Sequence, residues 1–135
     1  MKLMTKSIEE KLSHKPLYST EGQGLDAECV VKYFNPCGSY TFFATEGEKQ
    51  PDGDWLLFGL CYNHELEWGY ALLSELESVK LPFGLGIERD LYSSGTVREL
   101  TNQLGIDISS ISAHPEQEID EPSELSESSP DDDER

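Results

Sequence analysis

The chain has 135 residues, and its 27 acidic and 10 basic residues give a formal charge of −17 at pH 7. This charge repels phosphates, so direct binding to nucleic acid or to an anionic membrane surface is not expected. The longest apolar run, residues 55–62, is far shorter than the roughly 18 residues of a membrane-spanning helix. The three cysteines are odd in number and irregularly spaced, which is not typical of a secreted disulfide scaffold and favours a cytoplasmic location.

The composition changes abruptly near residue 113. Residues 114–135 contain ten acidic residues, one basic residue, three prolines and no aromatic residue. Such a segment buries too little apolar surface to offset the entropy that ordering it would cost. We therefore predict a single acidic domain over residues 1–113, with a charge of −8, and a disordered acidic tail over residues 114–135, with a charge of −9.

Alternating or continuous apolar residues predict four consecutive strands, at residues 27–33, 40–45, 55–62 and 68–73. Turn residues separate the members of each predicted hairpin, so neighbouring strands are expected to run antiparallel. Residues 46–54 are predicted to form a polar loop. Residues 87–92 are compatible with either a short strand or an ordered loop.

Three short helices are expected around this sheet, at residues 5–12, 75–79 and 96–104. Thr5 or Ser7 can cap the first helix, and Ser74 can cap the second. The predicted fold class is therefore α+β: a four-stranded antiparallel meander with short flanking helices at the N-terminus and after the sheet.

Five stretches of the sequence resemble a bacterial domain family that carries no functional name. They are Leu3-x-Thr5-Lys6, LYSTEGQ at 17–23, ATEG at 44–47, GYALLSELES at 69–78 and PxGLxIERDL at 82–91. They follow one another in the same order from about Lys2 to Tyr92. Members of this family are small single-domain proteins, often found on plasmids, phages and other mobile elements. The resemblance implies a bacterial cytoplasmic setting and supplies no catalytic residues.

The candidate metal ligands are the cysteines and one histidine. Cys61-x-x-His64 has local ligand spacing, and Cys29 and Cys37 would complete a set of four for zinc. No Cys-x-x-Cys pair accompanies them, and alternation places Cys29 on the same apolar face as Val31, so no metal site, no cofactor and no catalytic residue are predicted. A small metal- or cysteine-dependent hydrolase with a site near Cys61 and His64 remains an alternative.

The acidic residues of the domain gather in residues 46–77, where eight carboxylates stand against Lys49 alone. We expect a basic protein surface to be the partner of these side chains. They are Glu46, Glu48, Asp52, Asp54, Glu65, Glu67, Glu75 and Glu77. The leading interpretation is a non-enzymatic acidic interaction protein, in its finer form a nucleic-acid mimic whose carboxylates take the positions of phosphates. A further interpretation is an accessory regulatory subunit.

Overall fold

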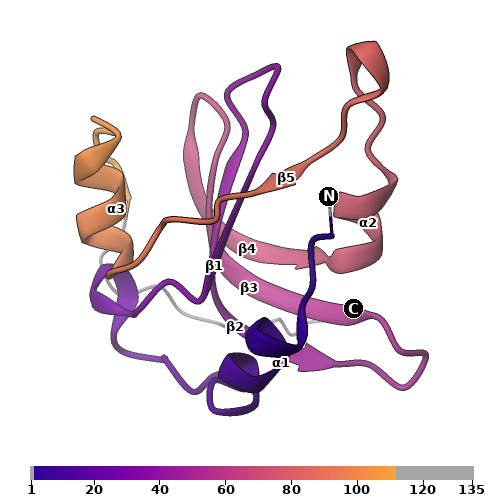
Figure 1. The fold of residues 1–135 in the computed structure, drawn as a ribbon. Helices are drawn as coiled ribbons and strands as arrows, with labels where there is room; N and C mark the ends of the chain where they lie inside the picture. The colour runs from indigo at the N-terminus through magenta and orange to yellow at the C-terminus, as the bar shows by residue number, and fades with distance from the viewer. Residues whose placement is uncertain (1, 112–135) are drawn as a thin grey trace, which may run out of the picture.

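The computed structural model describes residues 2–111, which fold around one antiparallel sheet with the strand order β4-β3-β2-β1-β5 (Figure 1). The strands are β1 (Val31–Phe34), β2 (Thr41–Lys49), β3 (Trp55–Tyr62), β4 (Leu66–Leu72) and β5 (Glu88–Arg89). The predicted α+β class is confirmed, and β1 to β4 follow one another as the predicted meander. β5 adds a fifth strand beside β1, and it lies in residues 87–92, for which the sequence allowed either a short strand or an ordered loop. The predicted tail lies outside the described residues.

Short helices surround the sheet: α1 (Lys6–Ser13), α2 (Leu73–Ser78) and α3 (Val97–Gln103), with 3-10 turns η1 (Gly24–Asp26) and η2 (Pro82–Gly84). Thr5 caps α1, since its hydroxyl accepts from the Ile8 N–H at 3.2 Å, so the alternative cap at Ser7 is wrong. Thr96 caps α3 together with Glu99, whose carboxylate accepts from the Thr96 N–H. Within residues 2–111, none of the helices has the length and apolar character needed to cross a membrane.

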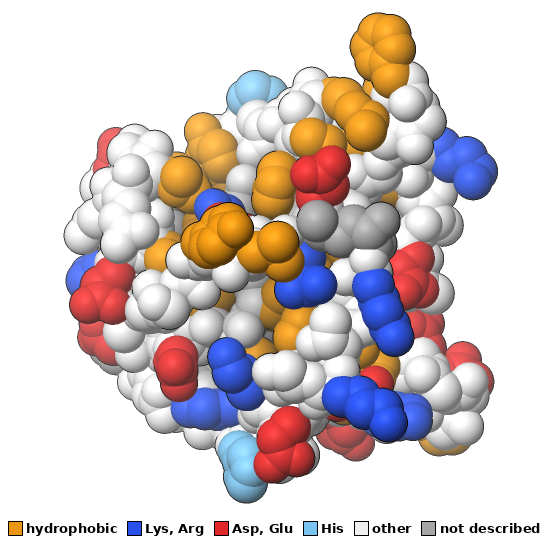
Figure 2. Space-filling model, viewed as in Figure 1, with side chains coloured by type: hydrophobic (Ala, Val, Ile, Leu, Met, Phe, Trp, Pro, Cys, Tyr) orange, Lys and Arg blue, Asp and Glu red, His pale blue; other side chains and the backbone are white. Residues whose placement is uncertain are grey.

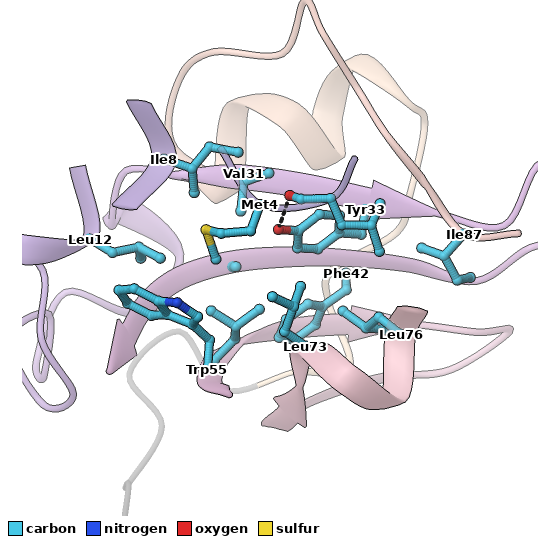
Figure 3. Close-up of a cluster of buried hydrophobic side chains, with 13 residues drawn as sticks. Met4, Ile8, Leu12, Val31, Tyr33, Phe42, Trp55, Leu73, Leu76 and Ile87 are labelled. Carbon is cyan, nitrogen blue, oxygen red and sulfur yellow. Dashed lines mark hydrogen bonds between the residues drawn. The ribbon is translucent and has the colours of Figure 1, made fainter. Parts of the chain in front are cut away.

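Two apolar clusters cover the two faces of the sheet. The first lies between the sheet and α1 and α2, and Figure 3 shows its aromatic centre at Tyr33, whose hydroxyl donates to the Leu3 carbonyl at 2.7 Å. Burial raises the pKa of Tyr33, which keeps this donor neutral. Phe42 belongs to the first cluster and the adjacent Phe43 to the second, because successive side chains of a strand point to opposite faces.

The second cluster packs α3 and the segment after it against the sheet. Its members include Val97 and Leu100 of α3 and Leu60 of β3. Cys29 also lies here, not on the face of Val31 as expected. β1 begins only at Val31, so Cys29 precedes the strand and the alternation of strand side chains does not apply to it.

Strand β2 is longer than expected. It continues through Lys49, where the polar sequence had predicted a loop from residue 46. The pairing with β3 shifts register between Ala44 and Glu46, which marks a β-bulge at Thr45. Glu46 directly follows the bulge and is buried, and the polar second half of β2 pairs with β3 as far as Lys49.

Candidate functional site

The predicted partner-binding carboxylates divide into two groups at opposite ends of β3. Glu65 lies exposed in the β3–β4 turn, and Glu67 lies exposed near the start of β4. Apart from the buried Glu46, the others gather near α2 and the β2–β3 loop, and we call this group the α2 acidic patch: Glu48, Asp52, Asp54, Glu75 and Glu77. At about 3.4 Å per residue, the eight residues of β3 separate the two groups by roughly 24 Å. Acidic side chains over α2 are visible at the margin of Figure 2.

Asp54 links the β2–β3 loop to the start of α2. Ser74 was expected to cap a helix that begins at residue 75, but α2 begins two residues earlier, at Leu73, and Ser74 lies inside its first turn. Asp54 Oδ1 accepts from the Ser74 N–H at 3.0 Å, and Oδ2 accepts from the Ser74 hydroxyl at 2.5 Å. These contacts, the Ser74 hydroxyl first, lower the pKa of Asp54. A loop carboxylate therefore does the capping that the sequence assigned to Ser74.

Replacing Ser74 by Ala is expected to raise the pKa of Asp54 toward its ordinary value of 3.8, because the charged carboxylate loses its hydroxyl donor. Since the folded pKa is depressed, the contact stabilises the fold above the ordinary pKa, and this contribution is lost as the pH falls through the depressed pKa. Carboxyl-detected NMR titration of both proteins measures the shift. Asp107, whose pKa is lowered by Ser109, is the internal control and should titrate alike in both proteins. An unchanged Asp54 pKa would contradict this assignment.

Glu46 does not belong to the acidic surface, which corrects the prediction for this residue. Its side chain is fully buried at 0% exposure. Its carboxylate accepts from the Tyr18 N–H at 2.7 Å, from the Thr20 N–H at 2.8 Å and from the Thr20 hydroxyl. A buried carboxylate is tolerated when such donors satisfy it, so Glu46 clamps the segment before η1 onto β2.

The residues of the alternative hydrolase site lie at the end of β3 and in the β3–β4 turn. Cys61 is half-buried, and burial and the neighbouring Glu67 raise the pKa of its thiol. A cysteine nucleophile needs the thiolate, so this environment works against that role. His64, in the left-handed conformation at φ 69°, lies exposed in the turn.

Ser39, which the sequence did not single out, approaches His64. Its Oγ lies 3.1 Å from His64 Nε2 and donates to Asn63 Oδ1 at 2.9 Å. Ser39 comes from the β1–β2 turn, so no local spacing in the sequence could reveal the pair. Within residues 2–111, no carboxylate hydrogen-bonds the His64 ring, so the third group that orients a catalytic histidine is not present in this part of the chain.

The two remaining candidate metal ligands, Cys29 and Cys37, differ in burial. Cys29 is buried, its pKa is raised by burial to about 12, and its thiol donates to the Val31 carbonyl. Cys37 is exposed in the β1–β2 turn. Among residues 2–111, no three of the His, Cys, Asp and Glu side chains group as a metal site would require.

The charge of the described body is unevenly distributed. Figure 2 shows Lys and Arg side chains gathered over α1 and the N-terminal segment, the side of the sheet that β5 crosses. Lys2, Lys6 and Lys11 are exposed there. The sequence did not indicate this gathering, because these cations and those of β1 and β5 are spread over residues 2–89. One side of the body is thus enriched in cations, whereas the α2 acidic patch carries carboxylates.

The fold defines the chain as a small α+β domain built on a five-stranded antiparallel sheet. Residues 3–106 match the family described as Protein of unknown function (DUF2958), and the chain belongs to that family. The match confirms the resemblance and extends it beyond Tyr92 to include α3. No curated protein and no solved structure matches the chain significantly.

Proposed function

We propose that this protein is a non-enzymatic interaction protein of the bacterial cytoplasm, and that its α2 acidic patch binds a basic surface on another protein. One observation carries the proposal: Glu48, Asp52, Glu75 and Glu77 are exposed, and none of them forms an ion pair within residues 2–111. Unneutralised carboxylates held on one rigid end of a domain repel each other, and a partner that brings Lys or Arg relieves this repulsion.

The uneven charge of the body favours one docking orientation. Charges interact over about 8 Å at physiological ionic strength, so an approaching basic surface is attracted by the patch and repelled by the lysines over α1. The expected gain is therefore in association rate and orientation as much as in affinity. An accessory subunit that acts by such docking is one form of the same function.

The finer version of this function is nucleic-acid mimicry. In that version the carboxylates occupy phosphate positions on a DNA-binding protein, which suits a family associated with mobile elements. Its specific consequence is competition: duplex DNA and this protein exclude each other from the partner. A partner that binds both at once would refute mimicry and leave the broader function standing.

Neutralising the patch with Glu48→Gln, Asp52→Asn, Glu75→Gln and Glu77→Gln is expected to weaken binding to the captured partner about 30-fold at low salt, roughly 0.5 kcal/mol per charge. The amides keep an acceptor oxygen, so the contacts of Asp52 with the Asp54 N–H and of Glu75 with the Leu72 N–H can persist. Partners are captured from bacterial lysate, purified and titrated between about 50 and 300 mM salt, where screening changes most.

The matched control is Glu65→Gln with Glu67→Gln, which removes two exposed charges at the other end of β3 and should change affinity by no more than about 3-fold. A chain that ends at residue 113 should also bind, because the patch lies on the body. Affinity that is indifferent to salt, or partners that are not basic, would refute the proposed function.

A further inference from the structure

The loop between α2 and β5, residues 79–87, projects from the body (Figure 1). It carries Phe83 within the 3-10 turn Pro82–Gly84, with 96% of its surface exposed. Val79 and Leu85 of the same loop are exposed as well. Figure 2 shows apolar side chains forming the outer end of this projection. A phenylalanine contributes nothing to the core when it is held in this position.

The loop is built to hold this shape. The Leu81 N–H donates to the Leu85 carbonyl at 2.9 Å, and the Leu85 N–H donates to the Pro82 carbonyl at 3.2 Å. Leu76 before the loop and Ile87 at its end are buried in the first apolar cluster. Both ends of the projection are therefore anchored, and the proline limits the conformations open to its tip.

Phe83 is held in an unfavourable conformation. Its φ of 63° and ψ of 26° lie in the left-handed region, which is rare for a bulky residue. Glycine would adopt these angles without the steric penalty. Such strain, at a side chain that makes no core contact, is typical of a site whose purpose lies outside the folded body.

The surroundings of the loop indicate the chemistry of what covers it. Glu75 and Glu77 precede it on α2, Glu88 follows it, and Lys80 is the one cation in residues 73–88. A cleft of about 550 Å³ beside the loop is bordered by Glu77, Glu88, Lys80 and apolar residues, so its charged side chains are acidic on balance. An anionic membrane would bring like charge against this surface, and two copies of a chain with a net charge of −17 repel each other, so charge opposes both as occupants.

We propose that residues 79–87 form a docking loop that inserts Phe83 into an apolar pocket with a basic rim on a protein partner. The sign of the partner's charge rests on the proposed function of the α2 acidic patch, which is continuous with the loop through α2. The apolar anchor at Phe83 is new relative to that proposed function. Protein interfaces concentrate their binding energy in a few aromatic side chains that are surrounded by polar rims.

Replacing Phe83 by Ser is expected to weaken binding to the partner about 30-fold or more, in line with loss of a fully buried aromatic anchor. The dependence on salt should stay that of the wild type, because an apolar contact is not screened. Tyr92→Ser is the matched control, since Tyr92 is also an aromatic residue at 91% exposure, and it should change affinity by no more than about 2-fold. Titration of both variants with the captured partner measures this.

Stability is the second readout. Phe83→Gly removes the left-handed strain, so its melting temperature should equal or exceed that of the wild type while its binding is weakened like that of Phe83→Ser. A loss of binding therefore cannot be attributed to unfolding. Phe83 variants that bind like the wild type would overturn the docking loop.

The occupant is tested directly by placing the photo-crosslinker benzoylphenylalanine at position 83 or at position 92 in bacterial cells. We expect an adduct only from position 83, joined to an apolar peptide of the captured partner that is flanked by Lys or Arg. An adduct to a second copy of the chain, equal adducts from both positions, or co-sedimentation with phosphatidylglycerol vesicles that Phe83→Ser abolishes would overturn the proposal.

The failures of the two proposals are distinguishable. A salt-dependent partner that binds Phe83→Ser normally overturns the docking loop and leaves the proposed function standing. A partner whose affinity ignores salt but falls in Phe83→Ser refutes the acidic function and the basic rim, while the apolar anchor itself is supported.

Discussion

Replacing Glu46 by Gln is expected to lower the free energy of unfolding by about 3 kcal/mol, since hydrogen bonds to a charged group contribute roughly 1.5–3 kcal/mol each. The carboxylate serves the N–H groups of Tyr18 and Thr20 and the Thr20 hydroxyl in a fully buried position. An amide offers one acceptor oxygen and turns its NH₂ group toward a donor. At least one of the two N–H groups then loses its acceptor.

Urea unfolding of Glu46→Gln and Glu48→Gln tests this expectation. Glu48 lies two residues farther along β2 and is exposed, so its change should stay within about 0.5 kcal/mol of the wild type. Amide exchange gives an independent readout, because Tyr18 and Thr20 should lose protection before the strands do. Equal stability of the two variants would show that the clamp at Glu46 contributes little. For a small domain with roughly 5–15 kcal/mol of stability, a loss of 3 kcal/mol is substantial.

This clamp gives a physical meaning to two of the motifs that carry the family resemblance. Residues 17–23 and 44–47 are separate in sequence, but Glu46 of the second motif binds Tyr18 and Thr20 of the first. Gly47 of the second motif donates to the Lys15 carbonyl just before the first. These two motifs therefore hold the segment before η1 against β2, and their contacts are structural.

The sheet was predictable wherever apolar patterning decides the structure. The continuous apolar run at residues 55–62 became β3 with the same bounds, because a central strand is covered on both faces. The start of β1 was not predictable from alternation, since Glu28 bridges to Thr96 beside α3 and the chain joins the sheet only at Val31. A two-residue strand such as β5 has too little pattern to be distinguished from an ordered loop, and it depends on β1 for its conformation.

The candidate site was predictable in composition but not in geometry. Eight carboxylates in one segment indicated one surface, but β3 carries the chain from one end of the sheet to the other and so divides them. Glu46 and Glu48 are equivalent in sequence and lie on the same face of β2, but the segment that carries Tyr18 and Thr20 covers only Glu46. Phenylalanine is a residue type usually found in the core. Phe83 is exposed because the loop buries Leu76 and Ile87 at its two ends and carries Phe83 at its tip.

Replacing Gly59 by Ala is expected to have the largest effect of the single substitutions, a loss of more than about 4 kcal/mol, in the range of severe core overpacking and backbone strain. Gly59 pairs with Ala44 beside the bulge. A Cβ atom there would lie 1.9 Å from the Phe43 carbonyl oxygen and 2.8 Å from the Ala44 Cα. Both are backbone atoms, so no side-chain rotation can relieve the contact, and β2 and β3 must separate at the centre of the sheet.

Gly69→Ala is the matched control, because Gly69 is the partner of Gly59 on β4 and no atom lies within 4 Å of its added methyl group. Alanine at an unhindered glycine reduces the freedom of the unfolded chain, so this variant should equal or exceed the wild type by up to about 1 kcal/mol. Thermal unfolding by circular dichroism compares the two alanine variants. A Gly59→Ala protein that melts within a few degrees of Gly69→Ala would refute the close approach of β2 and β3. Loss of its fold would show that the close approach of β2 and β3 beside the bulge makes glycine necessary at position 59.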